Sequence, residues 1–113
     1  MPIIKRIEYL DQITSLFKTS KIVVLVGPNQ VGKSSLAKTY AKVNSKKFIN
    51  IHFFDLEDPT DVTLLENAKL AIGSLEGLII IDELQRLPGL FPYIRVKADT
   101  LQKNSRILLL GSA

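Results

Sequence analysis

The sequence contains no cysteine and only one histidine. The lack of cysteine excludes disulfide bonds, thiolate zinc sites and cysteine nucleophiles, and it is compatible with a reducing compartment. His52 has no second histidine to share a metal, so we expect it to be structural. The longest apolar runs are Ile22–Val26, Leu78–Ile81 and Ile107–Leu110. A membrane-spanning helix needs about 20 apolar residues, and residues 1–6 lack the apolar segment of a signal peptide. We therefore expect a soluble, cytoplasmic protein without a membrane partner.

The composition is that of a globular domain, with 46% hydrophobic and 23% charged residues in a chain of 113. The net charge is +4, from 15 basic and 11 acidic residues. Four lysines gather at positions 38, 42, 46 and 47. A surface that contacts phosphate backbones would have such lysines, but a solvated helix face is favoured because lysine is a common residue there.

Hydrophobic periodicity predicts alternating helices and strands. Helices are expected over residues 5–17, 33–43, 61–75 and 93–103, and strands over residues 22–26, 48–56, 78–81 and 106–110. This alternation favours a three-layer α/β/α sandwich in which helices cover both faces of a mostly parallel sheet. The last strand is followed by only three residues. We therefore expect residues 1–113 to form the N-terminal part of a longer domain that is incomplete at its C-terminus.

A glycine-rich segment lies between the first strand and the second helix. Residues 27–34 read Gly-Pro-Asn-Gln-Val-Gly-Lys-Ser and match the P-loop pattern G-x-x-x-x-G-K-[ST] at every fixed position. Such a loop turns its backbone N–H groups toward phosphate oxygens, and the following helix adds its positive end. The predicted nucleotide-binding residues are Gly27, Pro28, Asn29, Gln30, Val31, Gly32, Lys33, Ser34 and Ser35. Lys33 is predicted to reach the terminal phosphates, Ser34 to bind Mg²⁺, and Ser35 to lie near the α-phosphate.

Two carboxylates follow the third predicted strand, at Asp82 and Glu83. The carboxyl ends of parallel strands face the ligand crevice, so both acids are expected on the phosphate side of the sheet. Asp82 is the candidate to hold the Mg²⁺ shell. Glu83 is the candidate to orient and polarise an attacking water, which favours hydrolysis as the reaction.

Further polar residues follow these strands. Gln85 and Ser112 are candidate sensors of the γ-phosphate, and Ser112 ends a strand that could lie between the P-loop strand and the acidic-pair strand. Ordinary turn roles fit both residues equally well, and Arg86 is expected to be a surface residue. Asp55, Glu57 and Asp58 could contact a ligand, although capping of the next helix is favoured.

Four segments together resemble the prokaryotic AAA-type P-loop ATPases found N-terminal to a DUF4143 domain. These segments are residues 27–34, Leu-Glu-Asp-Pro at 56–59, Ile-Asp-Glu-Leu-Gln-Arg-Leu-Pro at 81–88 with Leu-Phe-Pro at 90–92, and Leu-Leu-Gly-Ser-Ala at 109–113. The resemblance implies ATP as the nucleotide, the additional-strand catalytic-glutamate fold, and a continuation beyond Ala113. The chain departs from the family at Asn29, where arginine is usual, and at Leu110, where threonine is frequent.

These observations predict Mg²⁺-dependent ATP binding and hydrolysis that switches a C-terminal domain or a neighbouring subunit. The predicted catalytic residues are Lys33 and Glu83, and the predicted metal ligands are Ser34 and Asp82. Two other hypotheses remain open. One is a nucleotide-gated module that binds nucleic acid with little turnover, and the other is a small-molecule P-loop kinase, for which no acceptor site or arginine-bearing lid is recognisable.

Overall fold

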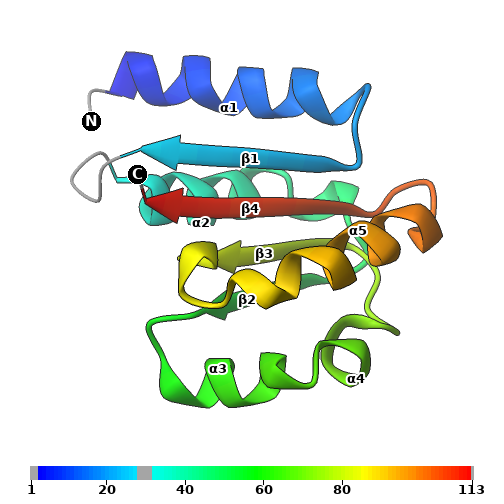
Figure 1. Cartoon of the computed structure of the whole chain (residues 1–113). Coiled ribbons are helices and arrows are strands. Elements are labelled where there is room, and N and C mark those ends of the chain that lie inside the picture. Colours follow the sequence, from blue (N-terminus) through cyan, green and yellow to red (C-terminus); the bar gives the residue numbers. More distant parts are fainter. Residues whose placement is uncertain (1–2, 28–31, 113) are drawn as a thin grey trace.

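The fold is a parallel four-stranded sheet covered by helices, as seen in a computed structural model that describes residues 3–27 and 32–112 (Figure 1). The strands are β1 (Ile22–Gly27), β2 (Ile51–Asp55), β3 (Leu78–Asp82) and β4 (Arg106–Ser112). The main helices are α1 (Ile3–Phe17), α2 (Lys33–Val43), α3 (Pro59–Glu66), α4 (Ala68–Ile72) and α5 (Phe91–Thr100). Short 3-10 turns are η2 (Ser45–Lys47), η3 (Leu84–Arg86) and η4 (Pro88–Leu90).

The strand order in space is β1-β4-β3-β2, and every neighbouring pair is parallel. The last strand in sequence therefore lies between β1 and β3. Its register places Leu108 beside Val23 on one side and beside Ile80 on the other. This arrangement confirms the predicted position of the last strand and the additional-strand class of α/β fold.

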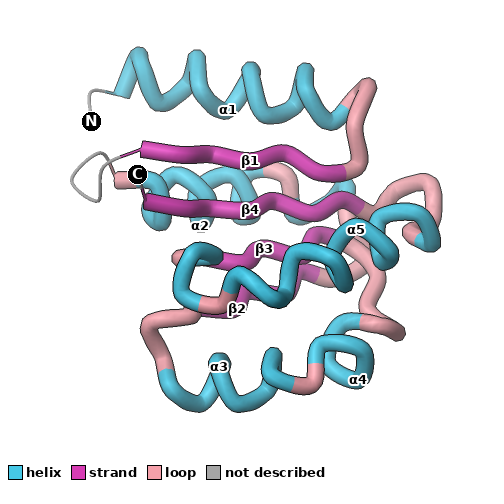
Figure 2. The backbone as a smooth tube through the Cα atoms, viewed as in Figure 1, coloured by secondary structure: helices cyan, strands magenta, loops and turns pink. Residues whose placement is uncertain are grey.

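Helices cover both faces of the sheet, as predicted (Figure 2). On one face, α1 and α2 pack through residues such as Ile13 and Leu36 against the even-numbered residues of β3 and β4. On the other face, α3, α4 and α5 pack through residues such as Leu65 and Ile94 against the odd-numbered residues. Residues 78–82 and 107–110 are buried, as expected for central parallel strands with apolar groups on both sides.

Three predicted elements have the wrong bounds, and one of them is α5, which runs over Phe91–Thr100 and not over residues 93–103. The helix expected over residues 61–75 is two helices, because the backbone of Asn67 leaves the helical region with ψ at 71°. Asp58 starts the first of them by accepting a hydrogen bond from the Thr60 N–H at 2.9 Å, which confirms the capping interpretation. The strand expected from residue 48 begins at Ile51, because residues 48 and 49 form a bend after the 3-10 turn at residues 45–47.

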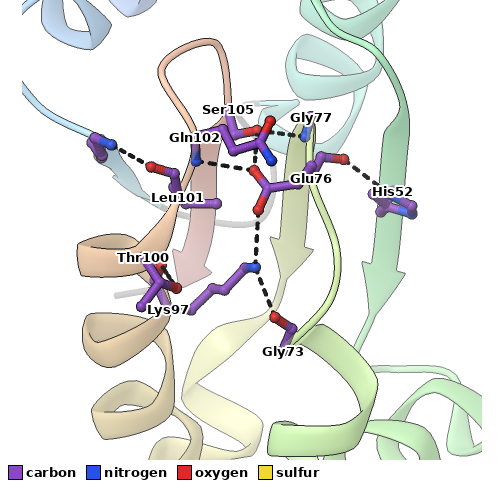
Figure 3. A network of polar contacts seen from close by, with 10 residues as sticks. His52, Gly73, Glu76, Gly77, Lys97, Thr100, Leu101, Gln102 and Ser105 are labelled. Atoms are coloured by element: carbon purple, nitrogen blue, oxygen red, sulfur yellow. Dashed lines mark hydrogen bonds and ion pairs between the residues drawn. The ribbon is translucent and has the colours of Figure 1, made fainter.

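A polar network fastens the amino ends of β3 and β4 (Figure 3). The Glu76 carboxylate accepts hydrogen bonds from the Ser105 hydroxyl at 2.6 Å and the Gln102 N–H at 3.1 Å, and it lies 3.4 Å from the ammonium of Lys97. Lys97 is buried and also donates to the Gly73 carbonyl at 3.0 Å. These contacts lower the pKa of Glu76 below its ordinary value of 4.5, and the Ser105 hydrogen bond is the largest cause.

Two further contacts in this network involve Gly77 and His52. The Gly77 N–H donates to Ser105 Oγ at 2.7 Å, and its φ of 101° is a conformation that favours glycine. A Cβ at this position would overlap the Asn50 carbonyl. The His52 ring contacts the Glu76 carbonyl at 3.2 Å, which is the structural role expected for it. In the described part of the chain, no helix has the length and apolar character needed to cross a membrane.

Glu76→Gln is expected to lower the free energy of unfolding by about 1–3 kcal/mol near neutral pH, because a charged acceptor of several hydrogen bonds is lost. The folded-state pKa is lowered, so this contribution is present above 4.5 and disappears as the pH falls through the folded pKa. Urea unfolding of the parent and the variant from neutral pH down to about pH 3 measures it. The exposed Glu66→Gln is the control, and a stability difference independent of pH would contradict the prediction.

Candidate functional site

The carboxyl ends of β1, β4 and β3 converge on one edge of the sheet, where the predicted site residues lie. β1 ends at Gly27, whose register partner on β4 is Ser112. β3 ends at Asp82, whose register partner on β2 is Asp55. Because all four strands are parallel, their last residues and the loops that follow open on the same side of the molecule.

The start of α2 has the geometry of an anion site. Gly32 is the N-cap residue, with φ at 76°, and among the described residues no side chain makes a cap hydrogen bond at this helix start. Within the same residues, no atom lies within 4 Å of where a Cβ would stand on Gly32. Backbone N–H groups and the helix dipole both favour an anion there. The predicted binding residues Pro28, Asn29, Gln30 and Val31 lie outside the described residues.

Lys33 is buried at the first position of α2, with 7% of its surface exposed. Its Nζ donates a 2.8 Å hydrogen bond to the carbonyl of Gly27, where β1 ends. This hydrogen bond therefore connects the first residue of α2 to the last residue of β1. Ser34 and Ser35 follow Lys33 on the first turn of α2. Ser34 is partly exposed, and Ser35 is exposed.

Asp82 is buried at the end of β3, and its carbonyl accepts a 3.1 Å hydrogen bond from the Leu56 N–H. Its carboxylate and the Ser34 hydroxyl are hard oxygen donors, which suit Mg²⁺. Within residues 3–27 and 32–112, no group of three or more His, Cys, Asp or Glu side chains could hold a metal ion. A site of one hydroxyl and one carboxylate fits Mg²⁺ because this ion commonly takes its other ligands from phosphate and water.

Glu83 lies next to Asp82 and is also buried, with 8% of its surface exposed. Its carboxylate accepts a hydrogen bond from Gln85 Nε2 and contacts the Ser112 hydroxyl at 3.1 and 3.3 Å. The amide oxygen of Gln85 in turn accepts from the Ser112 N–H at 3.1 Å. Three side chains from β4, the end of β3 and η3 thus form one closed hydrogen-bonded group.

The backbone of Glu83 is left-handed, with φ at 60° and ψ at 45°. No other non-glycine residue in the described ranges has a positive φ. This conformation costs a residue with a Cβ roughly 1 kcal/mol or more and often marks a functional position. It ends β3 abruptly and starts η3, which brings Gln85 back toward the Glu83 carboxylate.

The remaining polar candidates have local roles. Asp61 accepts from the Asp55 N–H at 2.8 Å, and Asp55 accepts from the Glu57 N–H at 2.9 Å. These bonds shape the turn between β2 and α3. Arg86 lies 3.8 Å from Glu57 with both side chains more than half exposed, so this ion pair contributes little to stability.

The sequence pattern placed Gln85 and Ser112 near the γ-phosphate but did not show that both bond Glu83. The contact depends on the insertion of β4 beside β3 and on the left-handed turn at Glu83, neither of which is a local property of the sequence. A glutamine two residues after a strand-terminal glutamate was the available signal.

A model of the AAA domain family matches residues 19–113. The chain is 38% identical over 111 residues to the uncharacterized protein Rv2008c of Mycobacterium tuberculosis, and this alignment covers 98% of the chain and 24% of the relative. It is 37% identical over 75 residues to the Lon protease of Mycoplasma genitalium, covering 66% of the chain and 9% of that protease. The chain therefore spans only a small part of these relatives.

Gln85→Ala is expected to lower the free energy of unfolding by about 1–2 kcal/mol, because it removes one bond to Glu83 and one to the Ser112 N–H. Urea denaturation measures the change. Gln102→Ala is the matched control, because the residue is exposed and bonds Glu76 through its backbone N–H.

A double-mutant cycle with Ser112→Ala tests the connection between the two side chains. Since they share one network, the coupling energy should exceed about 0.5 kcal/mol. Strict additivity of the two substitutions would contradict the hydrogen-bonded group described above.

Proposed function

The chain belongs to the AAA domain family, and on this basis we propose that it binds ATP with Mg²⁺ and hydrolyses the bond between the β- and γ-phosphates. The observation that carries the proposal is the position of the Glu83 carboxylate. It is buried, it is held from two sides by Gln85 and Ser112, and it follows directly on Asp82 at the sheet edge where the P-loop strand ends.

Binding starts from the helix end and Lys33. The ammonium exchanges the Gly27 carbonyl for oxygens of the terminal phosphates, while the N–H groups of the first turn of α2 face the phosphate chain. Charge-assisted hydrogen bonds of this kind contribute about 1.5–3 kcal/mol each. Bound Mg²⁺, held by Ser34 and Asp82, would neutralise phosphate charge, since oxygen donors of these two types suit it.

Hydrolysis requires a water in line with the bond to the leaving ADP. Glu83 accepts a hydrogen bond from this water and orients its lone pair toward the γ-phosphorus. The new bond forms between the water oxygen and the γ-phosphorus, and a proton of the water passes to the Glu83 carboxylate. The bond from the γ-phosphorus to the bridging oxygen breaks with its electron pair on that oxygen, so ADP and inorganic phosphate leave. Gln85 and Ser112 act on Glu83 as positioning residues, because each donates a hydrogen bond to its carboxylate.

The same two residues give the site a means of sensing the nucleotide. Ser112 ends β4 beside Gly27, the first residue of the phosphate loop, so a change at the γ-phosphate is transmitted to Glu83 through a short path. The relatives named above are much longer than this chain, which spans 24% of Rv2008c and 9% of the Lon protease. We propose that the transmitted change alters the position of a further domain or of a neighbouring subunit.

Lys33→Ala and Glu83→Gln should separate binding from turnover. Lys33→Ala is expected to weaken ATP binding at least tenfold, because a charge-assisted contact is lost. Glu83→Gln should bind ATP with parental affinity and lower kcat by about 10²–10⁴, the usual contribution of general base catalysis. Calorimetry and steady-state phosphate release with Mg²⁺ measure the two effects.

The matched controls for these variants are Lys69→Ala and Glu66→Gln, which change exposed residues on α3 and α4. Both should leave binding and turnover unchanged. Parental turnover by Glu83→Gln would reject the role of Glu83, and parental binding by Lys33→Ala would reject the phosphate site.

A further inference from the structure

The amino end of the sheet, opposite the phosphate loop, carries a concave basic surface. It is lined by four cationic residues from separate parts of the chain, and by no Asp or Glu: Lys18 after α1, Lys47 in η2, Lys103 before β4, and Arg106 at the start of β4. Figure 1 shows that the end of α1, the end of α2 and the start of β4 all lie at this end of the molecule. We refer to these four residues as the basic pocket.

Arg106 is held in a fixed orientation in this pocket. Its Nε donates to the Phe17 carbonyl at 2.9 Å, and its Nη1 donates to the carbonyls of Lys103 and Ser105 at 2.8 and 2.7 Å. No carboxylate takes part in these bonds, so the positive charge is oriented without being neutralised. A guanidinium that is already fixed loses less conformational entropy when it binds an anion.

The other three cations are exposed lysines, whose long side chains can adapt to a ligand. The floor beneath them is formed by the buried rings of Phe17 and Tyr40 and the partly exposed Phe48. These rings fix the shape of the pocket, because Phe17 and Tyr40 are packed in the core between α1 and α2.

Positive charge continues from the basic pocket along α2. Lys46 precedes Lys47 in η2, and Lys38 and Lys42 line a second concave surface with Ser34, Ser35 and Thr39. Among the described residues, none that lines this second surface is acidic. Exposed lysines therefore recur from Lys38 in α2 to the basic pocket at the amino end of the sheet.

We propose that the basic pocket and the adjoining lysines of α2 bind the phosphate backbone of nucleic acid. Repeated charges of one sign along a tract match a polymer with one phosphate per nucleotide, and such contacts supply most sequence-independent affinity. A protein partner would fit this surface poorly, because the centre of a protein interface is depleted of charged residues. The proposal assigns the phosphate contacts to cations that have no role in ATP hydrolysis as proposed above, although Ser34 and Ser35 line the same surface as Lys38 and Lys42.

The test is fluorescence anisotropy of the full chain with a labelled mixed-sequence oligonucleotide, single-stranded and duplex, over a series of salt concentrations. The double variant K18Q/K103Q removes two exposed cations of the pocket, and the double variant K69Q/R95Q removes two exposed cations on α4 and α5. Both variants change the net charge equally. Thermal melts of both proteins check that they remain folded.

Parental binding should weaken steeply as the salt concentration rises. In K18Q/K103Q the slope of log affinity against log salt should fall by about 2, one for each lysine that contacts a phosphate. The affinity at low salt should fall about tenfold or more, as expected when two phosphate contacts are lost. K69Q/R95Q should keep the parental slope, and Lys33→Ala should keep oligonucleotide binding, which separates this site from the P-loop.

Equal losses in the two double variants would overturn the proposal in favour of a general charge effect, and so would the absence of oligonucleotide binding by the parent. Loss of oligonucleotide binding in Lys33→Ala would assign the phosphate contacts to the P-loop instead. Sedimentation with phosphatidylserine vesicles measures whether the parent and K18Q/K103Q bind an anionic membrane surface. Binding to these vesicles that is tighter than to the oligonucleotide, and is lost in K18Q/K103Q, would assign the pocket to a membrane surface and overturn the proposal.

Discussion

Two ladders of backbone hydrogen bonds hold β4 between β1 and β3, and the positions of the candidate catalytic groups follow from them. The pairing with β1 brings Ser112 beside Gly27, and the pairing with β3 brings the same serine within reach of Glu83. The side-chain contacts of Ser112 and Glu83 would not be enough to fix the positions of these residues. The pairing of β4 with both neighbouring strands fixes them. If β4 lay at the edge of the sheet instead, the phosphate loop and the acidic pair would not share a common neighbour.

The two ends of this sheet have different chemistry. At the amino ends, the Glu76 carboxylate is satisfied by Ser105, Gln102 and Lys97, so its charge stabilises the fold. At the carboxyl ends, the acidic groups belong to the candidate site, and Glu83 shares its bonds with Gln85 and Ser112, which can rearrange around a ligand. Polar residues are buried in both places, but only the carboxyl ends open toward the first turn of α2 and its positive helix end.

Local sequence signals predicted most of the fold. Branched apolar runs gave the strands, and α2 runs from Lys33 to Val43 as the pattern indicated. The break at Asn67 and the 3-10 turn before β2 were missed, because hydrophobic spacing stays helical through Asn67 and strand-like through Phe48. For the site, the P-loop and acidic-pair patterns named Lys33 and Glu83. The bond from Gln85 to Glu83 depends on a left-handed backbone and a non-neighbouring strand, and periodicity contains no information on either.

The left-handed backbone at Glu83 has a consequence for how sequences of this fold can vary. Glycine would adopt φ near 60° without the steric cost that a Cβ brings, but it would lose the carboxylate that Gln85 and Ser112 hydrogen-bond. The chain has glutamate there instead. A trade-off of this kind, in which a residue is kept against its conformational preference, is expected where a side chain serves chemistry. Drift toward glycine at position 83 would therefore mark descendants that have kept the fold without the candidate catalytic carboxylate.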